Sequence, residues 1–235
     1  MKLKRIILSL FFPERCNICG EIKPFLKPYC PKCAIDTKII SPDACRQCGH
    51  ENCICDKDIS ATLSHLSAVY YYQGQLKRSI HQYKFYGESS YADIFGKAMA
   101  DKIKACYPDI KFDGVCFVPM TDSAIRKRGY NQSELLARVV ADKLKLPLAP
   151  CLEKIKEAPS QKDLTAEQRR ENIKKSFAVI EDIDIKDKTL ILCDDIKTTG
   201  ATLKECSDTL MTAGAKDIYC LCLALTTYLN ETDIF

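Results

Sequence analysis

Hydrophobic residues between positions 66 and 225 follow two alternating patterns. Four short runs are rich in aliphatic, β-branched and aromatic residues, as buried strands are, and they cover 66–72, 114–118, 189–193 and 218–225. Between them, apolar residues recur at the spacing of one helix face over 75–85, 90–105, 131–144 and 202–213. Because buried strands that alternate with helices form parallel sheets with helices on both faces, the pattern predicts an α/β fold.

Residues 1 to about 60 lack this pattern and are rich in cysteine, proline and lysine. Eight of the 15 cysteines lie between positions 16 and 55, in four close pairs, three of them Cys-x-x-Cys. A segment this poor in periodic apolar residues has almost no core of its own, so bound metal must supply its folding energy. We therefore expect a metal-binding module at 1–60 and an α/β domain at 61–235.

Two sets of four cysteines could each hold one zinc ion in a closed, structural thiolate site. Taken in sequence order, the sets are Cys16, Cys19, Cys30 and Cys33, and Cys45, Cys48, Cys53 and Cys55. A cross-braced pairing and a redox or iron–sulfur role stay open. His50 could replace a thiolate, although we expect it in solvent. Cysteines gathered in one segment favour metal binding in a reducing cytoplasm over a secreted disulfide scaffold.

Length and composition exclude two classes of protein. With 46% hydrophobic and 28% charged residues among 235, the chain can bury a core and is not broadly disordered. Its longest apolar runs, 6–12 and 219–225, fall short of the roughly 20 residues that span a bilayer, which excludes an integral membrane protein. The first run follows basic residues, as in a signal peptide, but no small-residue cleavage site follows, so we expect a short amphipathic helix.

Charge is distributed unevenly along the α/β domain. Residues 61–150 carry 13 basic and 8 acidic side chains, whereas residues 176–235 carry 5 basic and 11 acidic. The basic part favours an anion or a nucleic acid as partner, and a solvated surface is the alternative.

The strand at 189–193 leads directly into Asp194 and Asp195, and a loop of small polar residues then enters a helix. Ligands of open α/β sheets bind at the carboxyl ends of strands. Backbone N–H groups of such a loop and of the helix N-terminus can hold an anion, while paired carboxylates suit the vicinal hydroxyls of a sugar or a metal-bound sugar. The Gly-x4-Gly-Lys pattern of a Walker A loop is absent. The residues therefore predict a ribose 5-phosphate site.

Residues 190–202 resemble the phosphoribosyl-pyrophosphate motif of type I phosphoribosyltransferases over thirteen positions. The resemblance implies their Rossmann-like fold and assigns the ribose 2′- and 3′-hydroxyls to Asp194 and Asp195. It assigns the 5′-phosphate to Lys197, Thr198, Thr199, Gly200 and Thr202. It also implies transfer of ribose 5-phosphate from phosphoribosyl pyrophosphate, with Mg²⁺, to an acceptor that the sequence does not identify.

Further segments narrow the resemblance to the ComF family of competence-associated proteins. They are the eight-cysteine N-terminus, Tyr83–Gly87, the stretch from Pro119 through 126–137, and 161–177. The resemblance implies a cytoplasmic role in DNA uptake, with single-stranded DNA and competence-machinery proteins as partners. Two functions follow: a phosphoribosyltransferase, or a non-catalytic accessory protein that holds single-stranded DNA.

The run from Arg126 to Arg128 is expected to flank a turn at Gly129, beyond a strand that ends at Pro119. Arginine forks suit phosphate oxygens, so the run is a candidate clamp for pyrophosphate or DNA, with a surface charge run as the alternative. Asn131 follows as a site residue or as the N-cap of the next helix.

The long connection 155–175 is a candidate lid, because connections of this length are often functional. The resemblance places a mobile flap of the phosphoribosyltransferases here. Lys162, Arg169 and Arg170 would then reach the leaving pyrophosphate, and a disordered surface loop is the alternative.

Overall fold

The computed structural model describes residues 13–155 and 176–226, apart from 17, 25–26, 28, 54, 56–62 and 86–88. The amphipathic helix expected near the start of the chain lies outside these residues. So does most of the candidate lid, with its three basic residues. Within the described part, no helix is both long and apolar enough to cross a membrane.

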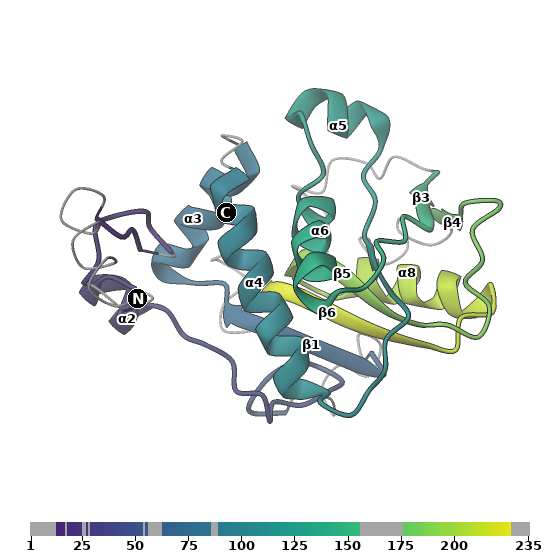
Figure 1. The fold of residues 1–235 in the computed structure, drawn as a ribbon, viewed down its shortest axis with the longest axis horizontal. Coiled ribbons are helices and arrows are strands. Elements are labelled where there is room, and N and C mark those ends of the chain that lie inside the picture. The colour runs from purple at the N-terminus through teal and green to yellow at the C-terminus, as the bar shows by residue number, and fades with distance from the viewer. Residues whose placement is uncertain are drawn as a thin grey trace.

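A four-stranded sheet forms the centre of the fold, and all of its neighbouring strands are parallel. Its order is β1 (His65–Tyr71), β6 (Asp217–Leu225), β5 (Thr189–Lys197) and β2 (Gly114–Phe117). These are the four strands that the sequence predicts, and the α/β fold is confirmed (Figure 1). However, β5 continues past residue 193 through the two aspartates to Lys197, which pairs with Leu225.

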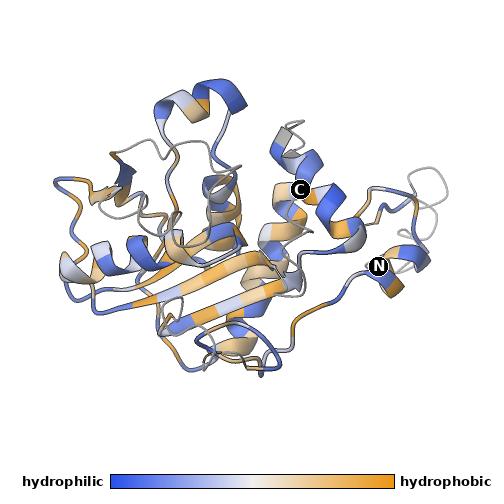
Figure 2. Cartoon of the chain, turned by 180° about the vertical axis from the view of Figure 1, so that it is seen from behind, coloured by the Kyte–Doolittle hydropathy of each residue, from blue (hydrophilic) through white to orange (hydrophobic). Residues whose placement is uncertain are grey.

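Helices cover both faces of this sheet, as expected (Figure 1). They are α3 (Gly74–Phe85), α4 (Ser89–Cys106), α6 (Gln132–Leu144) and α8 (Ala201–Thr212). Ile191 packs with residues of α4 and α6, whereas Leu190 and Leu192 pack with Leu203 and Leu210 of α8. Because successive strand residues point to opposite faces, β5 needs apolar residues over 190–193, where helices cover both faces, and hydrophobic residues dominate the strands in Figure 2.

Two elements differ from expectation or add to it. The arginine run lies on a helix, α5 (Asp122–Arg128), and not beside a simple turn. Thr121 caps its start by accepting from the Ala124 N–H at 3.3 Å, and Gly129 ends it with φ 89°. An antiparallel pair, β3 (Leu152–Lys154) and β4 (Phe177–Val179), brackets the segment in which the lid is expected.

The N-terminal module packs along the edge of the sheet that β1 forms. The Ile40 N–H donates to the Val69 carbonyl at 2.9 Å, and the Tyr71 N–H donates to the Lys38 carbonyl at 2.9 Å. Cysteines of the first set share a core with α3 and α4, whereas Ile40 and Ala44 join the core on the opposite face. The module thus uses the sheet domain as part of its core, and a division at residue 60 stays a prediction.

Candidate functional site

The turn between β5 and α8 forms a small cavity at the carboxyl end of β5. It is lined by Asp194 and residues 196–203. Gly200 adopts φ 83° at the N-cap position, where it offers no side chain to cap the helix. Thr198 is exposed, and Thr199 and Thr202 are half-buried. Because the first N–H groups of a helix lack partners within it, this turn presents donors suited to an anion.

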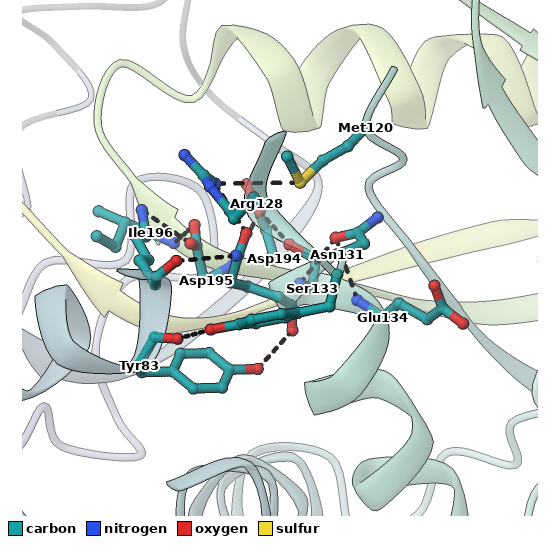
Figure 3. A network of polar contacts seen from close by, with 12 residues as sticks. Tyr83, Met120, Arg128, Asn131, Ser133, Glu134, Asp194, Asp195 and Ile196 are labelled. Carbon is teal, nitrogen blue, oxygen red and sulfur yellow. Dashed lines mark hydrogen bonds and ion pairs between the residues drawn. The ribbon is translucent and has the colours of Figure 1, made fainter. Parts of the chain in front are cut away.

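Two carboxylates lie beside the turn in a network of polar contacts (Figure 3). Ser133 Oγ donates to Asp194 Oδ1 at 2.8 Å, and the Asp195 N–H donates to the same oxygen at 2.9 Å. The Ile196 N–H donates to Asp195 Oδ1 at 2.6 Å. Lys84 Nζ lies 2.8 Å from Asp195 Oδ2 and forms an ion pair with it. The two acids are therefore held in fixed positions by α3, α6 and their own strand.

The electrostatics of the pair place one ionisation near neutral pH. Burial, and then the negative charge of Asp195, raise the pKa of Asp194 to about 7, against an ordinary value of 3.8. Burial alone would lower the pKa of Lys84, but the carboxylates of Asp195 and Asp194 outweigh it, and the pKa is raised. Lys84 therefore stays charged, while Asp194 can hold or release a proton in the physiological range.

Lys84 and Ser133 were missed as site residues by sequence reasoning, although both belong to segments that carry the family resemblance. The end of α3 is attached to the site by several bonds. Tyr130 Oη donates to the Tyr83 carbonyl, Tyr83 Oη donates to the Gln132 carbonyl at 2.8 Å, and Gln132 Nε2 donates to the Lys84 carbonyl at 3.5 Å. A residue more than a hundred positions before the acids thus becomes their neighbour.

The two arginines have different surroundings. Arg126 is exposed on α5, which stands away from the sheet in Figure 1. Arg128 is half-buried and donates to Gln132 Oε1 at 2.8 Å, which ties it to the polar network of Figure 3. The structure therefore brings Arg128, but not Arg126, into the network around the acids.

Asn131 is the N-cap of α6, one of the two roles considered for it. Its Oδ1 accepts from the N–H groups of Ser133 and Glu134, at 3.0 and 3.4 Å. Its Nδ2 donates to the Val118 carbonyl at 3.0 Å, and the residue is buried. Asn131 thereby fixes the first turn of α6 against the end of β2, which positions Ser133 for Asp194.

Lys197 lines the cavity, yet its side chain is only 2% exposed. After burial itself, the charge of Lys197 is the second cause that lowers the pKa of His50 to about 4. The ammonium is therefore close enough to His50 to act on its ionisation, and the residue is shielded from solvent. His50 is also buried, and not solvated as expected. The assignment of Lys197 to the phosphate stays a prediction.

The eight N-terminal cysteines form two clusters, and these are the two sets in sequence order. Within each cluster the four Sγ atoms lie within 4.8 Å of one another. The separations from Cys19 to Cys30 and from Cys45 to Cys55 are 3.6 Å, close to the roughly 3.8 Å between sulfurs of a tetrahedron with Zn–S bonds of about 2.3 Å. Both clusters fit a structural zinc ion. Among the described residues, no other group of three or more potential ligands gathers in this way.

Comparison with known proteins gives two matching family models. Residues 7–62 match the double zinc ribbon domain, and residues 130–231 match the phosphoribosyl transferase domain. The DNA utilization protein YhgH of Salmonella typhi is 24% identical over 95% of this chain and 96% of its own length. Competence protein F of Haemophilus influenzae is 26% identical over 86% of each chain, and competence protein ComFC of Streptococcus pneumoniae is 28% identical over 81% of this chain and 76% of its own.

Proposed function

We propose that this chain, a member of the ComF family that joins a double zinc ribbon to a phosphoribosyl transferase domain, binds phosphoribosyl pyrophosphate or ribose 5-phosphate at the end of β5. One observation carries the proposal: the anion-binding turn and the paired acids lie side by side at one strand end. The backbone N–H groups of the turn take the 5′-phosphate, with help from the threonine hydroxyls. Asp194 and Asp195 accept from the ribose hydroxyls.

As an enzyme, the chain would transfer ribose 5-phosphate to an acceptor. Positive charge then develops at C1′ as pyrophosphate leaves, so the protein's task is to stabilise charge and to exclude water. Mg²⁺, if bound with phosphoribosyl pyrophosphate, would supply positive charge that offsets the pyrophosphate. Arg128, tied to the network through Gln132, is placed to meet the pyrophosphate oxygens.

Calorimetric titration tests the proposal. Ribose 5-phosphate should bind with or without Mg²⁺, and phosphoribosyl pyrophosphate should bind more tightly when Mg²⁺ is present. Unphosphorylated ribose is the control ligand, and it should bind far more weakly because it cannot use the turn. Failure of both phosphorylated ligands to bind would exclude the proposed function.

We further propose that the chain acts in DNA uptake in the cytoplasm, alongside competence-machinery proteins. The names of the relatives, competence protein and DNA utilization protein, support this role. The second candidate function, a non-catalytic protein that holds single-stranded DNA, is favoured by the basic last turn of α5. That turn carries Arg126, Lys127 and Arg128.

Substitution of each arginine should separate these functions. Arg128→Ala should weaken binding of phosphoribosyl pyrophosphate by about 1.5–3 kcal/mol and spare ribose 5-phosphate, because only the former has a pyrophosphate. If DNA crosses α5, Arg126→Ala should reduce the log–log salt slope of single-stranded DNA binding by about 0.7, the share of one phosphate contact. A double variant that binds both ligands like the wild type would make the run a solvated surface.

A further inference from the structure

We infer that Lys84 is a positioning residue of the ribose site, which keeps the Asp194–Asp195 pair ionised and so sets the pH at which the site accepts a sugar phosphate. The inference rests on the proposed function and deepens it. It concerns a residue from α3, an element outside the segment that the phosphoribosyl transferase model matches.

The ammonium group of Lys84 is held against Asp195 by the structure around it. The side chains of Lys84 and Asp195 are 22% and 14% exposed, so water screens their 2.8 Å contact only in part. The backbone at this point is held by the bonds from Tyr130 and Gln132 described above. On its other side, α3 shares a core with the first cysteine cluster. A lysine on a free surface would lack these constraints, and its ion pair would contribute little.

The guanidinium of Arg128 is bound to Gln132 Oε1, and the neutral titratable groups near the pair do not offset its negative charge. Tyrosines and thiols face it from the end of β1, from α3, from the central strands and from α8. Burial raises the pKa of each of them, so they stay neutral; they are Tyr72, Tyr83, Cys193, Cys206, Cys220 and Cys222. The other lysine nearby, Lys197, is buried, and its charge acts on His50. Hydrogen bonds from Ser133 and from the Asp195 N–H lower the pKa of Asp194, and the positive charge of Lys84 lowers it further.

Removal of this charge has a definite consequence for the ligand. Two neighbouring carboxylates without a counter-ion resist double ionisation, so the pair keeps a proton to higher pH. A protonated carboxyl makes weaker hydrogen bonds to sugar hydroxyls than a carboxylate does. Binding at neutral pH should therefore weaken in the absence of Lys84 and recover as the pH rises.

The test compares Lys84→Met, Lys84→Arg and Lys97→Met, an exposed lysine of α4 that serves as the matched control. Ribose 5-phosphate is titrated into each protein from pH 6 to pH 9. In the wild type and in Lys97→Met, affinity should rise through about pH 7, the pKa of Asp194. In Lys84→Met, the midpoint should move up by about one pH unit, so that affinity at pH 7 should be about fivefold lower. Lys84→Arg should restore most of the affinity at pH 7 and most of the midpoint. The second ionisation of the ligand phosphate, near pH 6, affects all variants equally and does not change the comparison.

A measurement without ligand separates this inference from the proposed function. Carbon-13 NMR of the aspartate carboxyl groups should show the titration of the pair moved to higher pH in Lys84→Met. If that titration does not move, or if Lys84→Met has lower affinity with an unchanged midpoint, the inference is wrong. If the wild type binds no ribose 5-phosphate but the titration moves, the proposed function fails and the electrostatic role of Lys84 stands. Melting curves check that each variant is folded, and Lys84→Gln replaces Lys84→Met if the latter is not.

Discussion

We expect Cys33→Ser to remove one of two zinc ions per chain and to unfold the first ribbon. Cys33 is fully buried in a core with Ile18, Tyr70 and Ile80, so loss of its thiolate opens the metal site and places a hydroxyl in an apolar environment. Structural zinc contributes roughly 10–16 kcal/mol in zinc-finger peptides, as much as or more than the whole stability of a typical domain. Elemental analysis of the purified protein, together with its melting temperature, measures both effects.

The matched control is Cys106→Ser, a change at a buried cysteine outside both clusters. Cys106 Sγ donates to the Pro42 carbonyl, a bond that a serine hydroxyl can also make. This variant should keep two zinc ions and melt close to the wild type. Two zinc ions in Cys33→Ser, or iron in the wild type, would contradict the assignment of these clusters as zinc ribbons.

Most of the fold could be predicted because its strands are buried on both faces and read as continuous apolar runs. The same rule fails at the end of β5, where Asp194 and Asp195 continue the strand but break the apolar run. The helix α5 was not predicted either, although its capping threonine and its terminal glycine are both visible in the sequence. Seven residues are too few for a helical period to be distinguished from a turn.

The candidate site was predicted where its residues are contiguous, and missed where the fold brings distant segments together. The acids and the turn after them form one stretch of sequence, and the roles proposed for them come from one motif. Lys84 and Ser133 reach the acids from α3 and α6, and no spacing rule connects them. Lys197 shows the opposite case: it belongs to the motif, but the residue is only 2% exposed, which the sequence does not reveal.

Asp194→Asn and Asp195→Asn should each weaken binding of ribose 5-phosphate by about 1.5–3 kcal/mol, or roughly 10- to 150-fold, while leaving the fold intact. Each change removes an anionic acceptor for a ribose hydroxyl but keeps the size of the side chain. Asp195→Asn also leaves Lys84 without its carboxylate partner. Asp142→Asn, an exposed position on α6, is the control and should bind like the wild type. If all three variants bind ribose 5-phosphate as tightly as the wild type, the two acids do not take part in ribose recognition.

Asp194→Asn should also make the fold more stable at alkaline pH, which a purely structural aspartate would not do. The pKa of Asp194 is about 7 in the folded chain, above its ordinary 3.8, so the folded state holds a proton that the unfolded state releases. Wild-type stability therefore falls as the pH rises from about 4 through 7, and asparagine, which does not titrate, avoids this loss. The gain in melting temperature over the wild type should be larger at pH 8 than at pH 5. Such a gain, together with weaker binding of ribose 5-phosphate, would mean that the charge of Asp194 destabilises the fold but contributes to ligand binding. A gain in melting temperature that does not depend on pH would contradict the raised pKa.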